Sequence, residues 1–264
     1  MKIFDCFMYN SEDLILEIRL NSLNNYIDKF IIVEAKQDHQ GRVKQNYNFD
    51  LNKFNKFKNK IEYIKLENFP KNYDNWQREN FQRDFILKGL IGVDKNDYVV
   101  ISDIDEIPNF ENIESIFKSK NKYTAFKQKM IYYKLNLLNT TENEWYGSRM
   151  CKIKHLKKPQ WLRNQKVKKY PFYRLDKINW HIVNNGGWHF SNIMTPKEIS
   201  EKIKSFAHSE FSKPEFTDIE IIKKKIHLKK DLFDRNFIFE KITKEEDLPK
   251  YVIQNQKKFS EFLI

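Results

Sequence analysis

The first 120 residues alternate short apolar runs with longer amphipathic stretches, and this alternation limits the possible folds more than any other feature. Between the first two runs, leucine and isoleucine recur at steps of three and four over residues 16–27, the spacing of one helix face. Residues 74–90 are also expected to be helical. The apolar runs themselves predict strands at residues 3–8, 30–35 and 98–102, and the alternation of apolar and polar residues at 61–66 predicts another. Strands separated by helices in this way indicate an α/β fold with a parallel sheet.

The second part of the chain, residues 121–264, has a mixed pattern. Residues 123–138 are rich in aromatic side chains and predict one or two long strands, and helices are expected at 196–208 and 217–228. The charged C-terminal residues 241–264 are predicted to form one more helix. Since no repeat or low-complexity linker divides the chain, we expect a single domain over residues 1–264 with halves 1–120 and 121–264.

Composition restricts the partners and the setting. The 48 Lys and Arg residues exceed the 36 Asp and Glu residues, which gives a net charge of +12 and favours polyanions such as nucleic acid, anionic lipid head groups or phosphorylated small molecules. Cys6 and Cys151 are too few for a disulfide scaffold, and no run of about 18 apolar residues predicts a membrane span. We expect a cytoplasmic protein, with peripheral contact at the inner face of an anionic membrane.

An acidic cluster follows the last apolar run of the first half. Asp103, Asp105 and Glu106 come directly after residues 98–102, and Pro108 ends the segment. Open parallel sheets bind ligands at the carboxyl ends of their strands, where these carboxylates are expected to lie. In an extended chain Asp103 and Asp105 would share a face, with Cα atoms about 6.6 Å apart. The pattern therefore predicts a divalent cation bound by both carboxylates, with substrate phosphates as further ligands.

Two further groups of residues could carry chemistry. Gly186 and Gly187 allow a close backbone approach, and they precede Trp188, which offers a stacking face, and His189, which offers a nitrogen ligand. The helix at 74–90 carries Arg78, Gln82 and Arg83 near one face, just before the acidic segment.

In the order of these segments along the chain, the sequence resembles family 17 of the glycosyltransferases. This is the family of the bisecting β-1,4-mannosyl-glycoprotein N-acetylglucosaminyltransferases. The similar blocks include Ser-Asp-Ile-Asp-Glu-Ile-Pro at 102–108 and Gly-Gly-Trp-His-Phe-Ser at 186–191. Others, in the family's order, are residues 5–20, 32–34, 76–83 and 202–210. The resemblance implies a GT-A-like fold, a Rossmann-like nucleotide-binding sheet, a UDP-sugar donor with GlcNAc preferred, Mn²⁺ or Mg²⁺, and inversion at the anomeric carbon. Residues after about 215 have no counterpart in it.

The resemblance also implies roles for single residues. Asp103 and Asp105 would hold the metal ion, with Asp103 also reaching the nucleotide, and His189 would be a third ligand or a diphosphate contact. The residues expected to bind the nucleotide sugar are Asn10, Glu12, Glu34, Arg83, Asp103 and Trp188. Among these, Glu34 would face the uridine, and Arg83 would approach the diphosphate because a guanidinium matches two phosphate oxygens.

An inverting transfer needs a carboxylate that takes the proton of the acceptor hydroxyl. Glu210 is the preferred candidate because it lies in the acceptor-side half beside His208, with Glu144 second and Glu106 third. The acceptor is expected to be a glycan or glycolipid.

Two other functions are compatible with parts of the sequence. A metal-dependent phosphotransferase of the haloacid dehalogenase type also uses Asp-x-Asp after a strand, although its motif lies in the first strand. A non-enzymatic nucleic-acid binder would account for the basic segment 152–174, where aromatic residues alternate with Lys and Arg. No nucleic-acid-binding motif accompanies that segment, and we expect no nucleic-acid partner.

Overall fold

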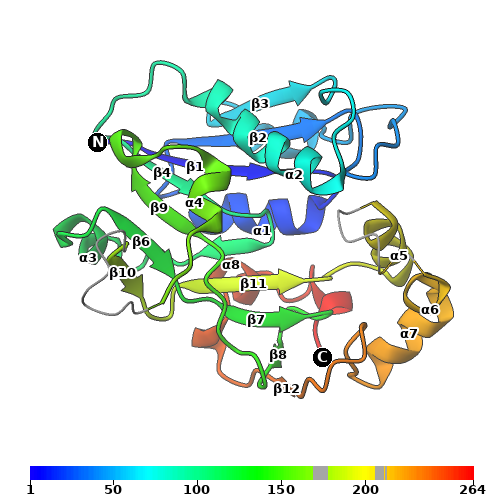
Figure 1. Cartoon of the computed structure of the whole chain (residues 1–264). Helices are drawn as coiled ribbons and strands as arrows, with labels where there is room; N and C mark the ends of the chain where they lie inside the picture. Colours follow the sequence, from blue (N-terminus) through cyan, green and yellow to red (C-terminus); the bar gives the residue numbers. More distant parts are fainter. Residues whose placement is uncertain (169–177, 206–210, 212) are drawn as a thin grey trace.

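The computed structural model describes residues 1–168, 178–205, 211 and 213–264. Its first sheet has seven strands in the order β10-β6-β9-β4-β1-β2-β3, and four neighbours, β4, β1, β2 and β3, run parallel (Figure 1). The strand bounds are β1 Ile3–Met8, β2 Lys29–Ala35, β3 Ile61–Leu66, β4 Tyr98–Ile101, β6 Tyr123–Phe126, β9 Arg149–Lys152 and β10 Trp180–Val183. This confirms the four predicted strands and the α/β fold class, and the architecture is consistent with a GT-A-like fold.

A second sheet of five strands, in the order β12-β8-β7-β11-β5, lies beside the first (Figure 1). Its strands are β5 Glu106–Pro108, β7 Lys129–Tyr132, β8 Leu137–Asn139, β11 Gly187–Ser191 and β12 Phe239–Lys241. The chain passes from β4 in the first sheet to β5 in the second through residues 102–105. The acidic segment is therefore the crossing between the two sheets.

Helix α1, Asp13–Leu23, lies between the two sheets, and its apolar residues join the largest core cluster together with residues of both sheets (Figure 1). Helix α2, Asn75–Asp84, packs against β1 and β2. Its N-cap residue is Asp74, whose side chain accepts a hydrogen bond from the Gln77 N–H in a capping box. The other α-helices are α3 Ile113–Lys118, α4 Pro159–Asn164, α5 Pro196–Ser205, α6 Pro214–Thr217, α7 Ile219–His227 and α8 Lys250–Gln254. Within the described residues, none of the helices has the length and apolar character needed to cross a membrane.

The predicted C-terminal helix over 241–264 is wrong. That segment begins at Lys241, the last residue of β12, and contains the five-residue helix α8 and two short 3₁₀ helices, Glu245–Asp247 and Ser260–Phe262. The physical reason is that a continuous helix is interrupted twice: the Ile242 N–H donates to the Asn136 carbonyl at 2.8 Å, and Pro249 has no N–H to donate within a helix. Val252 and Phe259 are buried in the largest core cluster beside α1.

A buried ion pair connects α1 to the first sheet. Arg19 on α1 and Asp5 on β1 are both fully buried, and the Arg19 guanidinium donates two hydrogen bonds to the Asp5 carboxylate, at 2.7 and 2.6 Å. The same guanidinium donates to the carbonyl oxygens of Asp103, Ile104 and Glu106, at 3.0, 3.1 and 2.9 Å. Arg19 therefore fixes the backbone of the crossing between the sheets.

Replacing Arg19 should strongly destabilise the protein. Arg19→Met leaves the Asp5 carboxylate buried without a counter-charge, which typically costs about 3–5 kcal/mol. Urea unfolding measures the difference in free energy of unfolding. Arg42→Met is the control, because Arg42 pairs with Asp38 at the surface and such pairs contribute about 0–1 kcal/mol. Equal losses in the two variants would contradict the role assigned to Arg19.

Candidate functional site

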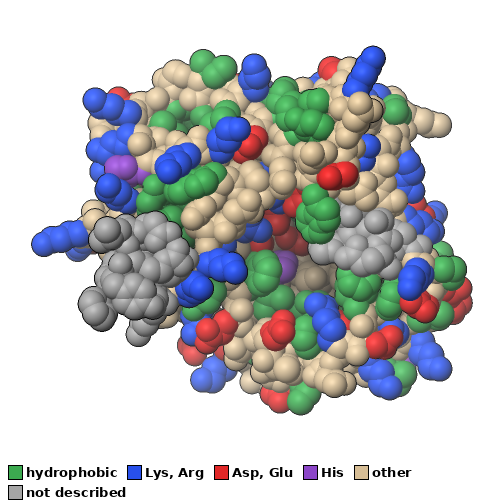
Figure 2. Space-filling model, in the orientation of Figure 1, with side chains coloured by type: hydrophobic (Ala, Val, Ile, Leu, Met, Phe, Trp, Pro, Cys, Tyr) green, Lys and Arg blue, Asp and Glu red, His purple; other side chains and the backbone are tan. Residues whose placement is uncertain are grey.

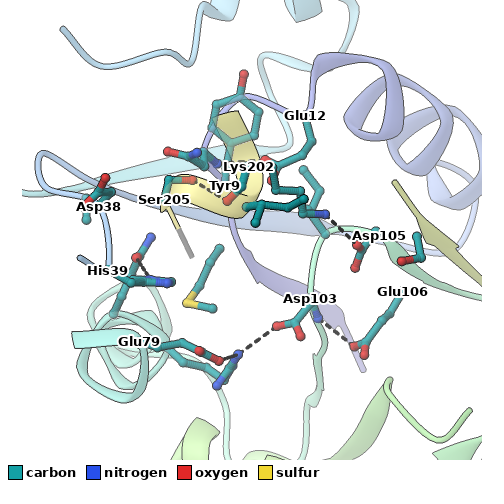
Figure 3. A pocket seen from close by; sticks show the side chains of 18 of the residues that line it. Tyr9, Glu12, Asp38, His39, Glu79, Asp103, Asp105, Glu106, Lys202 and Ser205 are labelled. Atoms are coloured by element: carbon teal, nitrogen blue, oxygen red, sulfur yellow. Dashed lines mark hydrogen bonds and ion pairs between the residues drawn. The ribbon is translucent and has the colours of Figure 1, made fainter. Parts of the chain in front are cut away.

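A cavity of about 400 Å³ opens where the parallel strands of the first sheet end (Figure 3). The first sheet contributes residues that follow β1, β2 and β4, and the second sheet contributes His189 and Ser191. Helices α2 and α5 and the loop residue Trp145 contribute further walls. Figure 2 shows a hollow in which acidic, histidine and hydrophobic surfaces lie together. Ligand sites at the carboxyl ends of parallel strands are the general rule for open α/β sheets.

The acidic segment is a turn rather than the extended chain that the sequence analysis assumed. The Glu106 N–H donates to the Asp103 carbonyl at 3.0 Å, and the Asp103 N–H donates to the Glu106 carboxylate at 2.8 Å. Ile104 is buried, as expected. Because the backbone turns here, Asp103 and Asp105 have separate sets of partners.

Two arginines bind the Asp103 carboxylate. One oxygen accepts from Arg83 on α2 at 2.9 Å, and the other accepts from Arg163 on α4 at 2.8 Å. Burial alone would raise the pKa of Asp103, but the charges of Arg163 and Arg83 hold that pKa well below its usual range. The two arginines therefore favour the ionised form of Asp103.

Asp105 lies between Lys202 and His189. Its carboxylate oxygens are 3.3 Å from the Lys202 ammonium and 3.7 Å from His189 Nε2. Strand pairing places His189 here, because β11 pairs with β5 and puts His189 opposite Glu106. The Phe190 N–H also donates to the Asp105 carbonyl at 2.8 Å.

These contacts allow a test of the predicted metal site. No group of three or more His, Cys, Asp or Glu side chains that could hold a metal ion is found among the described residues. Asp105, which directly precedes β5, and His189 on the neighbouring strand β11 nevertheless supply an oxygen and a nitrogen ligand. Two protein ligands fit a cation such as Mg²⁺, which keeps most of its positions for water and substrate phosphates. The residues fit a cation bound together with a substrate rather than one held by the protein alone.

Glu106 is fully engaged with protein groups. It is buried, and its carboxylate accepts hydrogen bonds from Arg163, from the Asp103 N–H and from Trp145 Nε1, the last at 2.6 Å. A carboxylate held in this way positions its neighbours and is poorly placed to accept a substrate proton. Of the other candidates for the base, Glu144 pairs with Lys127 and is not among the described residues that line the cavity. Glu210 lies outside the described residues.

The structure separates the residues expected to bind the nucleotide. Asn10, Glu12 and Arg83 line the cavity. Glu34 does not face it as expected: it is buried, and its carboxylate accepts from Lys44 at 2.6 Å, Tyr63 at 2.9 Å and the backbone N–H groups of residues 48 and 49. Glu34 thus shapes the loop after β2.

Trp188 is also placed differently from the prediction. Its indole N–H donates to the Asp247 carbonyl at 2.7 Å, and its ring lies against the C-terminal segment in a second, smaller cavity. Successive strand residues point to opposite faces, so His189 reaches the candidate site and Trp188 cannot.

Several cavity residues were missed by the sequence analysis. Glu79 pairs with Arg83 at 2.8 Å, and His39, whose pKa is lowered by burial, contacts Gln82 at 2.9 Å. The i,i+4 spacing of Glu79 and Arg83 was a usable signal. Arg163 gave no signal, because it is one of many basic residues in its segment. Lys202 begins one of the blocks that resemble the family, but it was assigned no role.

Comparison with known proteins assigns this chain to a family. The family model described as glycosyltransferase family 17 matches residues 1–264. Two curated relatives, both described as beta-1,4-mannosyl-glycoprotein 4-beta-N-acetylglucosaminyltransferase, are 21% identical (Rattus norvegicus) and 20% identical (Homo sapiens) over 245 residues. Each comparison covers 83% of this chain and 45% of the relative, so the chain spans less than half the length of these relatives.

The ion pairs of Asp103 predict a pH-dependent stability. Because its pKa is lower in the folded than in the unfolded protein, where it is about 3.9, its full stabilising effect is present above that value. The effect decreases progressively below it and is lost as the pH falls through the pKa of the folded protein. Asp103→Asn should therefore be less stable than the parent protein at pH 7. The difference should shrink as the pH falls below about 5.

Chemical unfolding between pH 7 and pH 3 measures this difference. Glu114→Gln is the control, because Glu114 is exposed and pairs with Lys118 at the surface. A constant difference between Asp103→Asn and the parent protein across this range would rule out the proposed ionisation.

Proposed function

Because this chain belongs to glycosyltransferase family 17, we propose that it transfers N-acetylglucosamine from UDP-GlcNAc to a hydroxyl group of a glycan or glycolipid. The names of the relatives support this donor sugar. The observation that carries the proposal is the cavity at the ends of β1, β2 and β4, in which Asp103 and Asp105 alternate with basic side chains. Now that the family is assigned, we have no observation that favours a phosphotransferase or a nucleic-acid-binding protein.

The basic side chains suit a diphosphate. Arg83 and Lys202 line the cavity, and Arg163 lies directly behind Asp103. Arginine can bind two phosphate oxygens at once, and lysine adds a compact charge. In the described structure these cations neutralise carboxylates, and we propose that a bound diphosphate takes over part of their hydrogen bonds.

Asp105 and His189 would hold the divalent cation, which we take to be Mn²⁺ or Mg²⁺. When bound, such a cation acts as a Lewis acid that stabilises negative charge on the departing diphosphate. The Lys202 ammonium, 3.3 Å from Asp105, has to give up part of that contact when a cation binds. Asn10 and Glu12, which follow β1, would bind the nucleoside end.

The transfer itself is proposed to be a single displacement. The acceptor oxygen forms a bond to the anomeric carbon, the bond from that carbon to the UDP oxygen breaks, and its electron pair leaves with UDP. The acceptor proton passes to a carboxylate on the side away from UDP. Glu210 remains our candidate for this base, since Glu106 is engaged with Arg163 and Trp145.

Turnover of UDP-GlcNAc tests the proposal. We expect hydrolysis of this donor in the presence of Mn²⁺ and its loss in the presence of a chelator. Asp105→Asn should lower the rate by at least about 100-fold, because loss of the cation removes several kcal/mol of leaving-group stabilisation. Measuring UDP release at saturating donor and Mn²⁺ gives the comparison.

The matched control is Glu220→Gln, which changes an exposed carboxylate on α7. It should release UDP at the parental rate. If Asp105→Asn retained near-normal turnover, the assignment of the cation to Asp105 would be incorrect.

A further inference from the structure

Trp145 is a large apolar residue that is exposed on the cavity wall and is nevertheless held in one place. Its side chain retains 39% exposure, and it lines the same cavity as Asp103 and Asp105. Its backbone makes two hydrogen bonds with the buried residue Gln128, at 2.9 and 2.7 Å. The position of Trp145 is thus fixed by the backbone before any ligand arrives.

The orientation of the Trp145 ring is fixed as well. Its indole N–H donates to Glu106 at 2.6 Å, and Arg163 donates to the same carboxylate. Gly147 leaves room for this contact, because a Cβ atom there would lie 2.1 Å from Glu106 Oε1 and 2.4 Å from Trp145 Nε1. The polar edge of the ring is therefore satisfied inside the protein, so a ligand would meet its apolar surface.

The ring lies next to the candidate reaction centre. The Trp145 and His189 rings are 5.3 Å apart at an angle of 31°, and His189 Nε2 is 3.7 Å from Asp105. Trp145 precedes β9 and lies beside β11 of the second sheet, whereas the nucleoside end of the cavity is formed by residues that follow β1 and β2. Trp145 thus occupies the side of the cavity away from the expected nucleoside.

The chemistry of this surface favours a sugar. The face of an aromatic ring carries partial negative charge, so it repels phosphate and attracts the C–H bonds on one face of a pyranose. The hydroxyl groups around the edge of such a sugar would reach the carboxylates that line the cavity. We propose that Trp145 is the stacking platform for the acceptor sugar, held in its orientation by Glu106 and Gly147. This inference rests on the proposed glycosyl transfer.

Binding of simple sugars tests the platform directly. Saturation-transfer NMR of methyl β-mannoside, methyl β-glucoside and methyl β-galactoside, recorded with UDP and Mn²⁺ present, measures which pyranose contacts the protein and through which protons. We expect at least one glycoside to receive saturation on the protons of one ring face. In Trp145→Leu its affinity should fall about two- to tenfold, the range for one aromatic contact, and Trp145→Phe should lie between this variant and the parent protein.

Trp180→Leu is the matched control, because Trp180 lies on the edge strand β10 and packs against Tyr123. It should bind the glycoside as the parent protein does. Calorimetric titration of UDP into the Trp145 variants separates the acceptor from the donor: the loss of glycoside affinity should clearly exceed any loss of UDP affinity.

Two results would overturn the inference. One is the absence of saturation on all three glycosides in the parent protein. The other is a parallel loss of UDP and glycoside affinity in Trp145→Leu, which would place the ring in the donor site. Glycoside binding that depends on Trp145 in a protein that does not hydrolyse UDP-GlcNAc would instead support the platform and count against the proposed donor.

Discussion

The buried ion pair between Arg19 and Asp5 is the interaction on which the candidate site depends. A guanidinium without solvent must satisfy all its donors internally, and Arg19 does so with the Asp5 carboxylate, the Ser102 hydroxyl and carbonyl oxygens of the turn at 103–106. Those carbonyls point toward α1, and the carboxylates of Asp103 and Asp105 reach the cavity. A charge buried in the core thus determines how two charges at the surface of the cavity are presented.

Each of the three carboxylates at 103–106 lies beside a basic side chain. Asp103 forms ion pairs with Arg83 and Arg163, and Arg163 also pairs with Glu106. Asp105 contacts both Lys202 and His189. Each carboxylate of this partly buried site therefore has a counter-charge beside it. The proposed substrate also carries both kinds of charge, as a diphosphate accompanied by a metal ion. Binding would then exchange ion pairs rather than bury new unpaired charges.

The parallel half of the fold could be predicted from the sequence, because β1, β2 and β4 are buried and leave nearly continuous apolar runs, while β3 at the edge alternates apolar and polar residues. The place of Asp103 and Asp105 after β4 followed from the same pattern. What could not be predicted is the direction of individual side chains. Glu34 ends β2 as expected, but the loop after the strand folds back over its carboxylate. Trp188 and His189 are neighbours in a motif, and the strand sends them to opposite faces.

The residues that were missed depend on contacts between distant parts of the chain. Arg163 meets Asp103 from 60 positions away, and Lys202 meets Asp105 from 97 positions away. In a chain with 48 Lys and Arg residues, nothing local distinguishes Arg163 from basic residues at the surface, and the block that contains Lys202 gave no reason to pair it with Asp105. The fixed ring of Trp145 likewise depends on Glu106, 39 positions earlier.

A crystal structure of the protein with UDP and Mn²⁺, with data collected at a wavelength where manganese scatters anomalously, tests the central claim most directly. That claim is that the turn held by Arg19 presents Asp105 to a metal ion bound with the diphosphate. The account predicts an anomalous peak at the Asp105 carboxylate, beside His189, with the diphosphate reached by Arg83 or Lys202. UDP bound in the cavity with the manganese peak elsewhere, and the Lys202–Asp105 ion pair unchanged, would contradict it.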